Sequence, residues 1–201
     1  MHLAHHHVLS LVTCTFFCSA WAQVPEPAAE RNGLHSLEAY EESNHLSAGY
    51  ERWREFGLRA IYQYGDHQLN AEASNMNRFN ENGNYLGLGD TVVWSPLWYT
   101  SLDLGAGDGA AYLPRYRLDG FIHRKWLDDQ RLVGSLGLGR YRAPDGHQDD
   151  HASLGLTYYF EQPWVVQTQV RHTHSQPGGI GTRQYFIAAT WGQHQRTQIT
   201  G

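Results

Sequence analysis

The stretch Leu132–Arg142, LVGSLGLGRYR, alternates leucine-rich positions with small ones. A period of two indicates a β-strand with two chemically different faces. A strand on the core of a soluble protein would carry Lys, Glu or Thr on its second face, yet this one carries Ser135, Gly137 and Gly139 there. We therefore expect the leucines to meet lipid and the small residues to leave room inside a narrow barrel.

The same alternation recurs along the chain with aromatic and β-branched residues, and no segment predicts a helix. Ten strands are expected, near residues 36–44, 53–64, 67–75, 84–94, 98–107, 115–125, 131–142, 151–160, 164–173 and 182–191. Leucine and alanine lie centrally on their apolar faces and aromatic residues lie near the ends, as on a lipid-facing surface. The fold class that follows is all-β, an antiparallel up-and-down transmembrane β-barrel.

Two of the expected strands fit this pattern less simply. In 164–173 we assign lipid to the face that carries Trp164, Val166, Thr168 and Val170. In 84–94, Asp90 shares a face with leucines, which predicts a local bulge that shifts the register.

The connections between the expected strands alternate in length. Polar connections of seven or eight residues lie at 45–52, 76–83, 108–114, 143–150 and 174–181, and short ones lie between them. Outer-membrane barrels have this pattern, because their periplasmic turns are short and their outer loops are longer. A Greek-key sandwich would mix the lengths.

Residues 1–22 have the features of a secretory signal peptide. An apolar run from Val8 to Phe17 precedes Ala20-Trp21-Ala22, so cleavage is expected after Ala22. Both cysteines would leave with the signal, which excludes a disulfide framework or a thiolate metal site in the mature chain. Residues 23–35 are rich in Pro and Ala and predict a disordered lead-in to a barrel domain over 36–201. The net charge of -5 gives no basic footprint for nucleic acid.

The C-terminal residues, WGQHQRTQITG, lack the aromatic-ended final strand of most outer-membrane barrels. Only a half-length eleventh strand, from Gln195 to Gly201, is expected after the tenth. Bacterial barrels normally close with an even number of strands and no free edge. We therefore expect a C-terminally incomplete barrel.

Several segments resemble the YaiO family of outer-membrane β-barrel proteins. They are PRYRLDGFIHRKW (114–126), the strand RLVGSLGLGRYR that follows it, SLGLTYYFEQPWVV (153–166), GIGTRQYFIAATWG (179–192), LEAYEESNHLSAGYERW (37–53) and NRFNENGNYLGLG (77–89). The resemblance implies an outer-membrane location in a Gram-negative envelope, exposure at the cell surface and no established activity. YaiO-like chains continue through further strands past this C-terminus, which implies about twelve strands in the full form of the barrel. The partners expected are outer-membrane lipid and lipopolysaccharide, the outer-membrane insertion machinery and, at the outer loops, an envelope glycan.

Two groups of residues could carry chemistry: a set of histidines and a serine beside a histidine. A metal site from His147, His151, His172 and His174 would lie on an outer rim, but no carboxylate is fixed by spacing, so neither metal nor cofactor is expected. Ser175 beside His174 is the best candidate nucleophile. Neighbours on a strand point to opposite faces, which places this pair poorly for catalysis.

The densest mixed-charge set on the other faces is expected to line the lumen: Arg59, Glu72, Asp103, Arg117, Asp119 and His123, with Arg115 nearby. Mixed signs favour salt bridges that fill the lumen over a single-sign selectivity filter. The function expected is structural, binding or adhesive, without catalysis. The alternatives are a barrel enzyme that modifies envelope lipid or glycan, and a secreted β-sandwich that binds carbohydrate through its aromatic residues.

Overall fold

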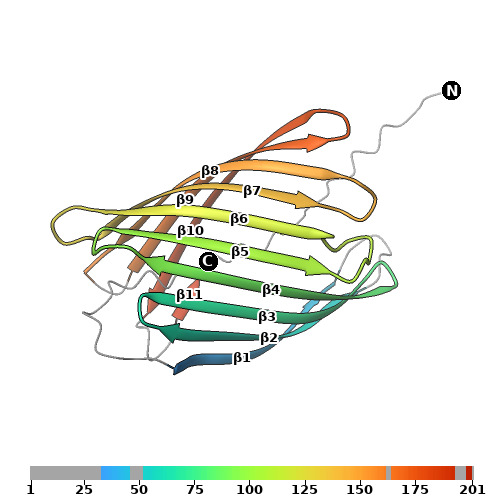
Figure 1. Cartoon of the computed structure of the whole chain (residues 1–201), viewed down its shortest axis with the longest axis horizontal. Helices are drawn as coiled ribbons and strands as arrows, with labels where there is room; N and C mark the ends of the chain where they lie inside the picture. The colour runs from blue at the N-terminus through green and yellow to red at the C-terminus, as the bar shows by residue number, and fades with distance from the viewer. Residues whose placement is uncertain (1–32, 46–51, 162–163, 193–197, 201) are drawn as a thin grey trace.

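The computed structural model describes residues 33–45, 52–161, 164–192 and 198–200. They form one antiparallel sheet in which each strand pairs with its neighbours in the sequence (Figure 1). The strands are β1 (Gly33–Asn44), β2 (Trp53–Tyr64), β3 (His67–Arg78), β4 (Glu81–Val93), β5 (Trp98–Gly107), β6 (Tyr116–Trp126), β7 (Leu132–Arg142), β8 (Gln148–Tyr159), β9 (Trp164–Gln176), β10 (Ile180–Gly192) and β11 (Gln198–Thr200). The predicted up-and-down order is confirmed, and a two-layer sandwich is excluded as the arrangement of these strands.

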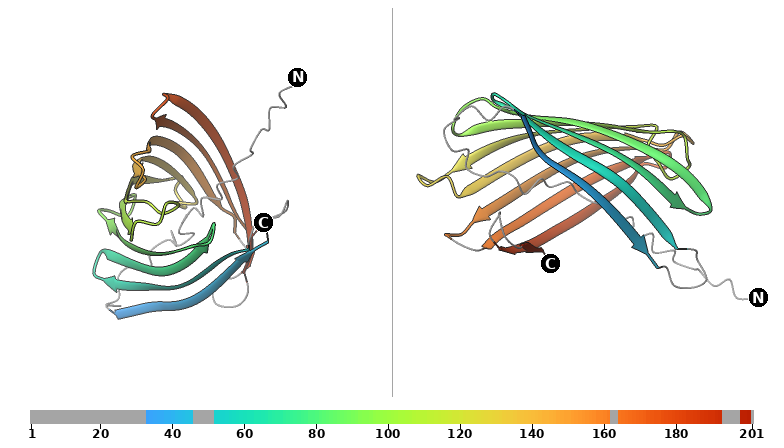
Figure 2. Two further views of the ribbon diagram at one scale, coloured as in Figure 1. Left: turned by 90° about the vertical axis from the view of Figure 1, so that its right-hand side faces the viewer. Right: turned by 90° about the horizontal axis from the view of Figure 1, so that it is seen from below.

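The sheet curls strongly about an axis that runs along the strands (Figure 2). In the described part of the chain, β1 pairs only with β2 and β11 only with β10, so the sheet is not closed. No helix among the described residues is long and apolar enough to cross a membrane.

The expected strands agree with the structure except near their ends. β1 begins at Gly33, so residues 33–35 belong to a strand and not to the expected lead-in. A short eleventh strand pairs with β10, as the C-terminal pattern predicted. The predicted signal peptide, residues 1–22, and residues 23–32 lie outside the described residues.

Alternation sorts each strand into an outward apolar face and an inward polar face. On β7, the outward Leu136 and Leu138 are 55% and 67% exposed, whereas the inward Val133 is 2% exposed. Aqueous solvent would disfavour so many exposed leucines, but a hydrocarbon surround favours them. The interpretation of Leu132–Arg142 as a lipid-facing strand agrees with this arrangement.

The inward glycines of β7 are needed because other side chains lie over them. A methyl group on Gly137 would clash with the ring of Phe121, and one on Gly139 would clash with Asp119 and His151. These positions stay small so that larger neighbours can pack across the inside, as the sequence predicted.

The two irregular strands have different outcomes. On β9, Gln167 and Arg171 are buried inside while Trp164 and Thr168 are exposed outside, which confirms the predicted face. The bulge predicted near Asp90 is wrong, because the register of β4 is continuous with both neighbouring strands. Asp90 faces outward near the end of β4, where His67 Nδ1 lies 2.8 Å from its Oδ2 and supplies a polar partner.

The strict alternation of long and short connections is wrong. The expected connection 76–83 is a two-residue turn, Phe79 and Asn80, both with positive φ. Its flanks extend β3 and β4, because asparagine side chains pair across the strands at 2.8 and 2.9 Å. The connections 143–147 and 177–179 are likewise shorter than expected, and a long loop remains at 108–115. Most of the connection 45–52 lies outside the described residues.

The two ends of the strands therefore differ in their residues more than in the length of their connections. The strand ends form two rims of the curled sheet. We call one rim the loop edge; it carries the connections 45–52, 79–80, 108–115, 143–147 and 177–179. We call the opposite rim the turn edge. Exposed tryptophans gather at the turn edge: Trp94, Trp98, Trp126, Trp164 and Trp191. Such a belt marks a membrane interface.

Candidate functional site

The inward face is the candidate functional site, because the polar and charged residues of the strands meet there. The structure places all six predicted lumen residues on this face. They fall into groups on different strands, so they do not converge on one reacting centre.

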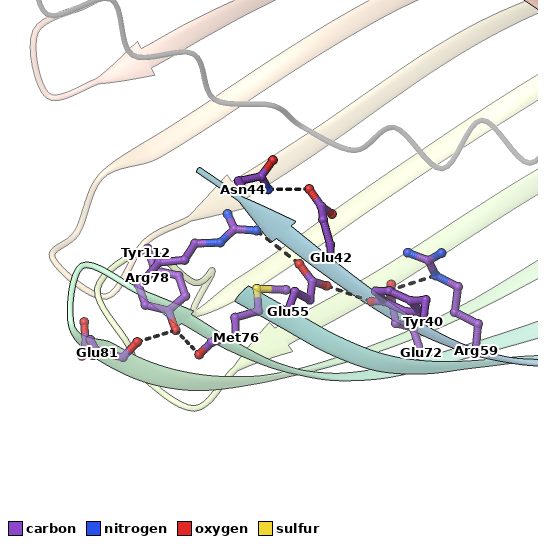
Figure 3. Close-up of polar contacts among 10 residues, drawn as sticks. All are labelled: Tyr40, Glu42, Asn44, Glu55, Arg59, Glu72, Met76, Arg78, Glu81 and Tyr112. Carbon is purple, nitrogen blue, oxygen red and sulfur yellow. Dashed lines mark hydrogen bonds and ion pairs between the residues drawn. The ribbon is translucent and has the colours of Figure 1, made fainter. Parts of the chain in front are cut away.

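The first group, which we call the N-terminal cluster, lies across β1, β2 and β3 (Figure 3). The Tyr40 hydroxyl contacts Glu55 Oε1 at 2.8 Å and Glu72 Oε1 at 2.6 Å. Arg59 donates from Nε to Glu72 at 3.2 Å, lies 3.6 Å from Glu38, and stacks 3.8 Å from the centre of the Tyr40 ring. Arg59 of β2 thus pairs with carboxylates from both neighbouring strands, Glu38 of β1 and Glu72 of β3.

Arg78 connects this cluster to the loop edge. Its guanidinium lies 3.2 Å from Glu55 Oε2 and faces the rings of Trp53 and Tyr112. The Tyr112 hydroxyl donates to the carbonyls of Met76 and Glu81 at 2.7 and 3.0 Å (Figure 3). The loop 108–115 is therefore fixed over the β3–β4 turn.

The base of this loop is also held by hydrogen bonds. Asn84 donates to Asp108 from its backbone N–H at 3.0 Å and from its side-chain amide at 2.8 Å. These bonds lower the pKa of the Asp108 carboxyl, so it is ionised at neutral pH. Leu113, 3% exposed, packs beneath the loop near Gly83. This arrangement gives the loop edge an ordered surface.

The second group, the central cluster, contains Asp119, Arg117 and His151. Asp119 is 2% exposed, pairs with Arg117 on its own strand, and lies 2.9 Å from His151 Nε2 on β8. The missing side chain at Gly139 of β7 makes this contact possible, because β7 lies between β6 and β8. A buried carboxylate with cationic and imidazole partners braces three strands from inside.

The third group surrounds His123. Its Nδ1 lies 2.7 Å from Ser135 Oγ, its Nε2 lies 3.3 Å from Ser101 Oγ, and its ring stacks on Tyr99 at 4.3 Å. A serine beside a histidine is the beginning of a nucleophile and base pair. Among the described residues, no carboxylate is hydrogen-bonded to His123 to orient it, so the geometry favours a packed hydrogen-bonded core.

Asp103 lies apart from these groups, on β5. It accepts a hydrogen bond from Asn70, and both side chains meet over Gly89, where a methyl group would clash with them. Asp103 is therefore a further packing contact of the inside.

The histidines considered for a metal site do not converge. His151 points inward, His172 and His174 are exposed on the outward face, and His147 lies in a turn 3.0 Å from Asp149. No three metal-binding side chains gather within the described ranges. Ser175 and His174 point to opposite faces of β9, which agrees with the prediction.

Sequence reasoning missed partners that only strand pairing defines. Tyr40 was not a candidate, although it joins Glu55 to Glu72. His151 was considered only as a metal ligand, although it lies on the same inward face of its strand as Ser153 and Thr157. Lys125 was also missed; it is 4% exposed and faces inward near the turn edge. Lys125 and His151 lie two positions along their strands from His123 and Ser153, so the same alternation would have found them. Tyr40 would have required the two faces of the expected strand 36–44, which were not assigned.

Comparison with known families gives one match. The model of the YaiO membrane beta barrel domain matches residues 34–201, which cover all the strands described above apart from Gly33, the first residue of β1. Comparisons with the curated proteins and with the solved structures gave no match. The outward leucines, the tryptophan belt and the up-and-down order all agree with a barrel that spans a membrane. The chain belongs to the YaiO family of membrane β-barrels.

Proposed function

We propose that this protein is a surface-exposed outer-membrane barrel that serves the envelope as a structural, binding or adhesive scaffold, and that it is neither an enzyme nor an open pore. The observation that carries the proposal is the inward face, where charges of both signs pair with one another. A selectivity lining needs one sign of charge, whereas mutual pairing fills a narrow lumen and stiffens the wall.

Two further observations support the location. An apolar outward band with a tryptophan belt at one edge fits a lipid bilayer. The N-terminal strand begins at the turn edge, and outer-membrane barrels hold that edge in the periplasm. The loop edge, with its ordered 108–115 loop, would then face the outside and offer the surface for binding or adhesion.

Impermeant thiol labelling of intact cells tests this orientation. Single cysteines at Ala111 and Asp145, on the loop edge, should react, whereas cysteines at Asp66 and Asp129, on the turn edge, should react only after lysis. The signal carries both native cysteines, so the mature background is free of thiols. Labelling of the turn-edge positions on intact cells would invert the orientation.

Conductance in planar bilayers tests the filled lumen. The full chain, inserted at high salt, should give no stable unit steps, because the buried ion pairs leave no continuous single-sign path. A porin inserted in the same bilayers is the control for detection. Reproducible unit steps from this protein would refute the scaffold proposal and favour a pore.

A further inference from the structure

The outward face carries a group of basic side chains where β7, β9 and β10 approach the loop edge. We call it the basic patch, and its members are Arg140, Arg142, His172, His174 and Arg183. Cross-strand pairing places the members of the basic patch next to one another. Asp150 of β8 lies opposite both Arg140 and His174, and His172 lies opposite Arg183.

Positive charge dominates this patch. Its one carboxylate, Asp150, is paired with Arg140 at 2.6 Å and accepts a further hydrogen bond from Gln148. Arg142 and Arg183 have exposed side chains and, within the residues that the structure describes, no acidic partner. Two guanidinium groups are therefore available to an anion from outside the protein.

The patch borders directly on the lipid-facing band. His172 and Arg183 lie in register with the apolar Leu138 and Ala152. One outward step further toward the middle of the strands, the row is wholly without charge and consists of Leu136, Leu154, Val170 and Tyr185. Basic side chains just beyond an apolar band lie at the depth of lipid headgroups. The corresponding outward positions of β3 and β4 carry uncharged asparagine pairs, and Arg54 of β2 lies beside them as a single basic residue, so grouped basic side chains are found on β7–β10.

From this placement we infer that the basic patch binds the phosphate groups of lipopolysaccharide in the outer leaflet. The inference rests on the proposed outer-membrane location with the loop edge outward. Guanidinium groups match phosphate oxygens through paired N–H donors. Arg142 and Arg183 are three strands apart, roughly 14 Å across the sheet, and are offset by four residues, roughly 14 Å, along the strands. They would therefore contact different phosphate groups.

Binding of purified lipopolysaccharide to the full chain in phosphatidylcholine nanodiscs tests the inference. Loss of one arginine near an anionic lipid surface weakens binding about fivefold. The double variant Arg142→Gln/Arg183→Gln should therefore weaken binding about 25-fold. Arg54→Gln is the matched control, because Arg54 also faces outward at the loop edge but on β2, away from the patch. It should leave binding unchanged.

Three further measurements make the outcome decisive. Dephosphorylated lipopolysaccharide and phosphatidylglycerol should both bind the wild type much more weakly, and added salt should weaken the wild-type complex. Equal binding by the double variant, or equal binding of phosphatidylglycerol, would overturn the inference. If the double variant fails to fold, the single variants and the salt series decide. Because binding in nanodiscs does not depend on orientation in cells, the thiol labelling tests the proposed function separately.

Discussion

Replacing Asp119 with alanine should destabilise the protein by about 3–5 kcal/mol. Asp119 is 2% exposed and contacts both Arg117 and His151, so its removal leaves a guanidinium and an imidazole inside the sheet without their carboxylate. The loss also disconnects β6 from β8 across Gly139. Denaturant unfolding of the protein folded in lipid vesicles would measure this change.

Asp150→Ala is the matched control for this effect. Asp150 also pairs with an arginine, at 2.6 Å, but its side chain is 39% exposed at the loop edge. Solvent screens such a pair, so its loss should cost about 0–1 kcal/mol. Replacing the whole central cluster with Arg117→Met, Asp119→Leu and His151→Leu should recover much of the stability, because no charge is then left unpaired. A similar small cost for both single alanine variants would show that the central cluster does not brace the sheet.

The facing of each strand could be predicted because it depends on a period of two. Once Leu136 is assigned to lipid, the pleat fixes the direction of Ser135 and Gly137, and the same logic places Arg59 and Asp119 inside. The assignment of β9 also succeeded, although Thr168 interrupts its apolar face and Val165 lies on the polar one. Alternation is a local property, so it can be read from the chain without knowledge of the partner strands.

The positions of the turns could not be predicted from composition. Asparagine usually indicates a turn, yet Asn77 and Asn82 pair across two extended strands at 2.8 Å. Their cross-strand partners satisfy the amide groups that would otherwise favour a turn. Likewise, Asp90 indicated a bulge only because the sequence does not show His67 opposite the end of its strand.

The partners inside the sheet depend on register and on side-chain length. Tyr40 and Glu72 are far apart in the sequence, and their contact requires two successive pairings, β1 with β2 and β2 with β3. Arg59 was expected to pair in the lumen, but its stacking on Tyr40 follows from the same pairings. The sequence therefore predicts which residues are inside and leaves their grouping to the sheet.

The lipid-facing assignment makes the second large prediction. Leu136→Arg should cost about 2–4 kcal/mol when unfolding is measured in bilayers, because Leu136 lies at mid-strand and an arginine there must enter the hydrocarbon core. The cross-strand neighbours of Leu136 are Ile122 and Leu154, which are also exposed and apolar. None of them could pair with the new charge.

Leu132→Arg on the same face of the same strand is the control that separates lipid from water. Leu132 lies between Trp126 and Tyr158 at the turn edge, where a long side chain can extend to the headgroups. The cost there should fall to about 0–1 kcal/mol. A sheet whose outward face met water would show small and similar costs at both positions, so the difference between them measures the depth of Leu136 in the membrane.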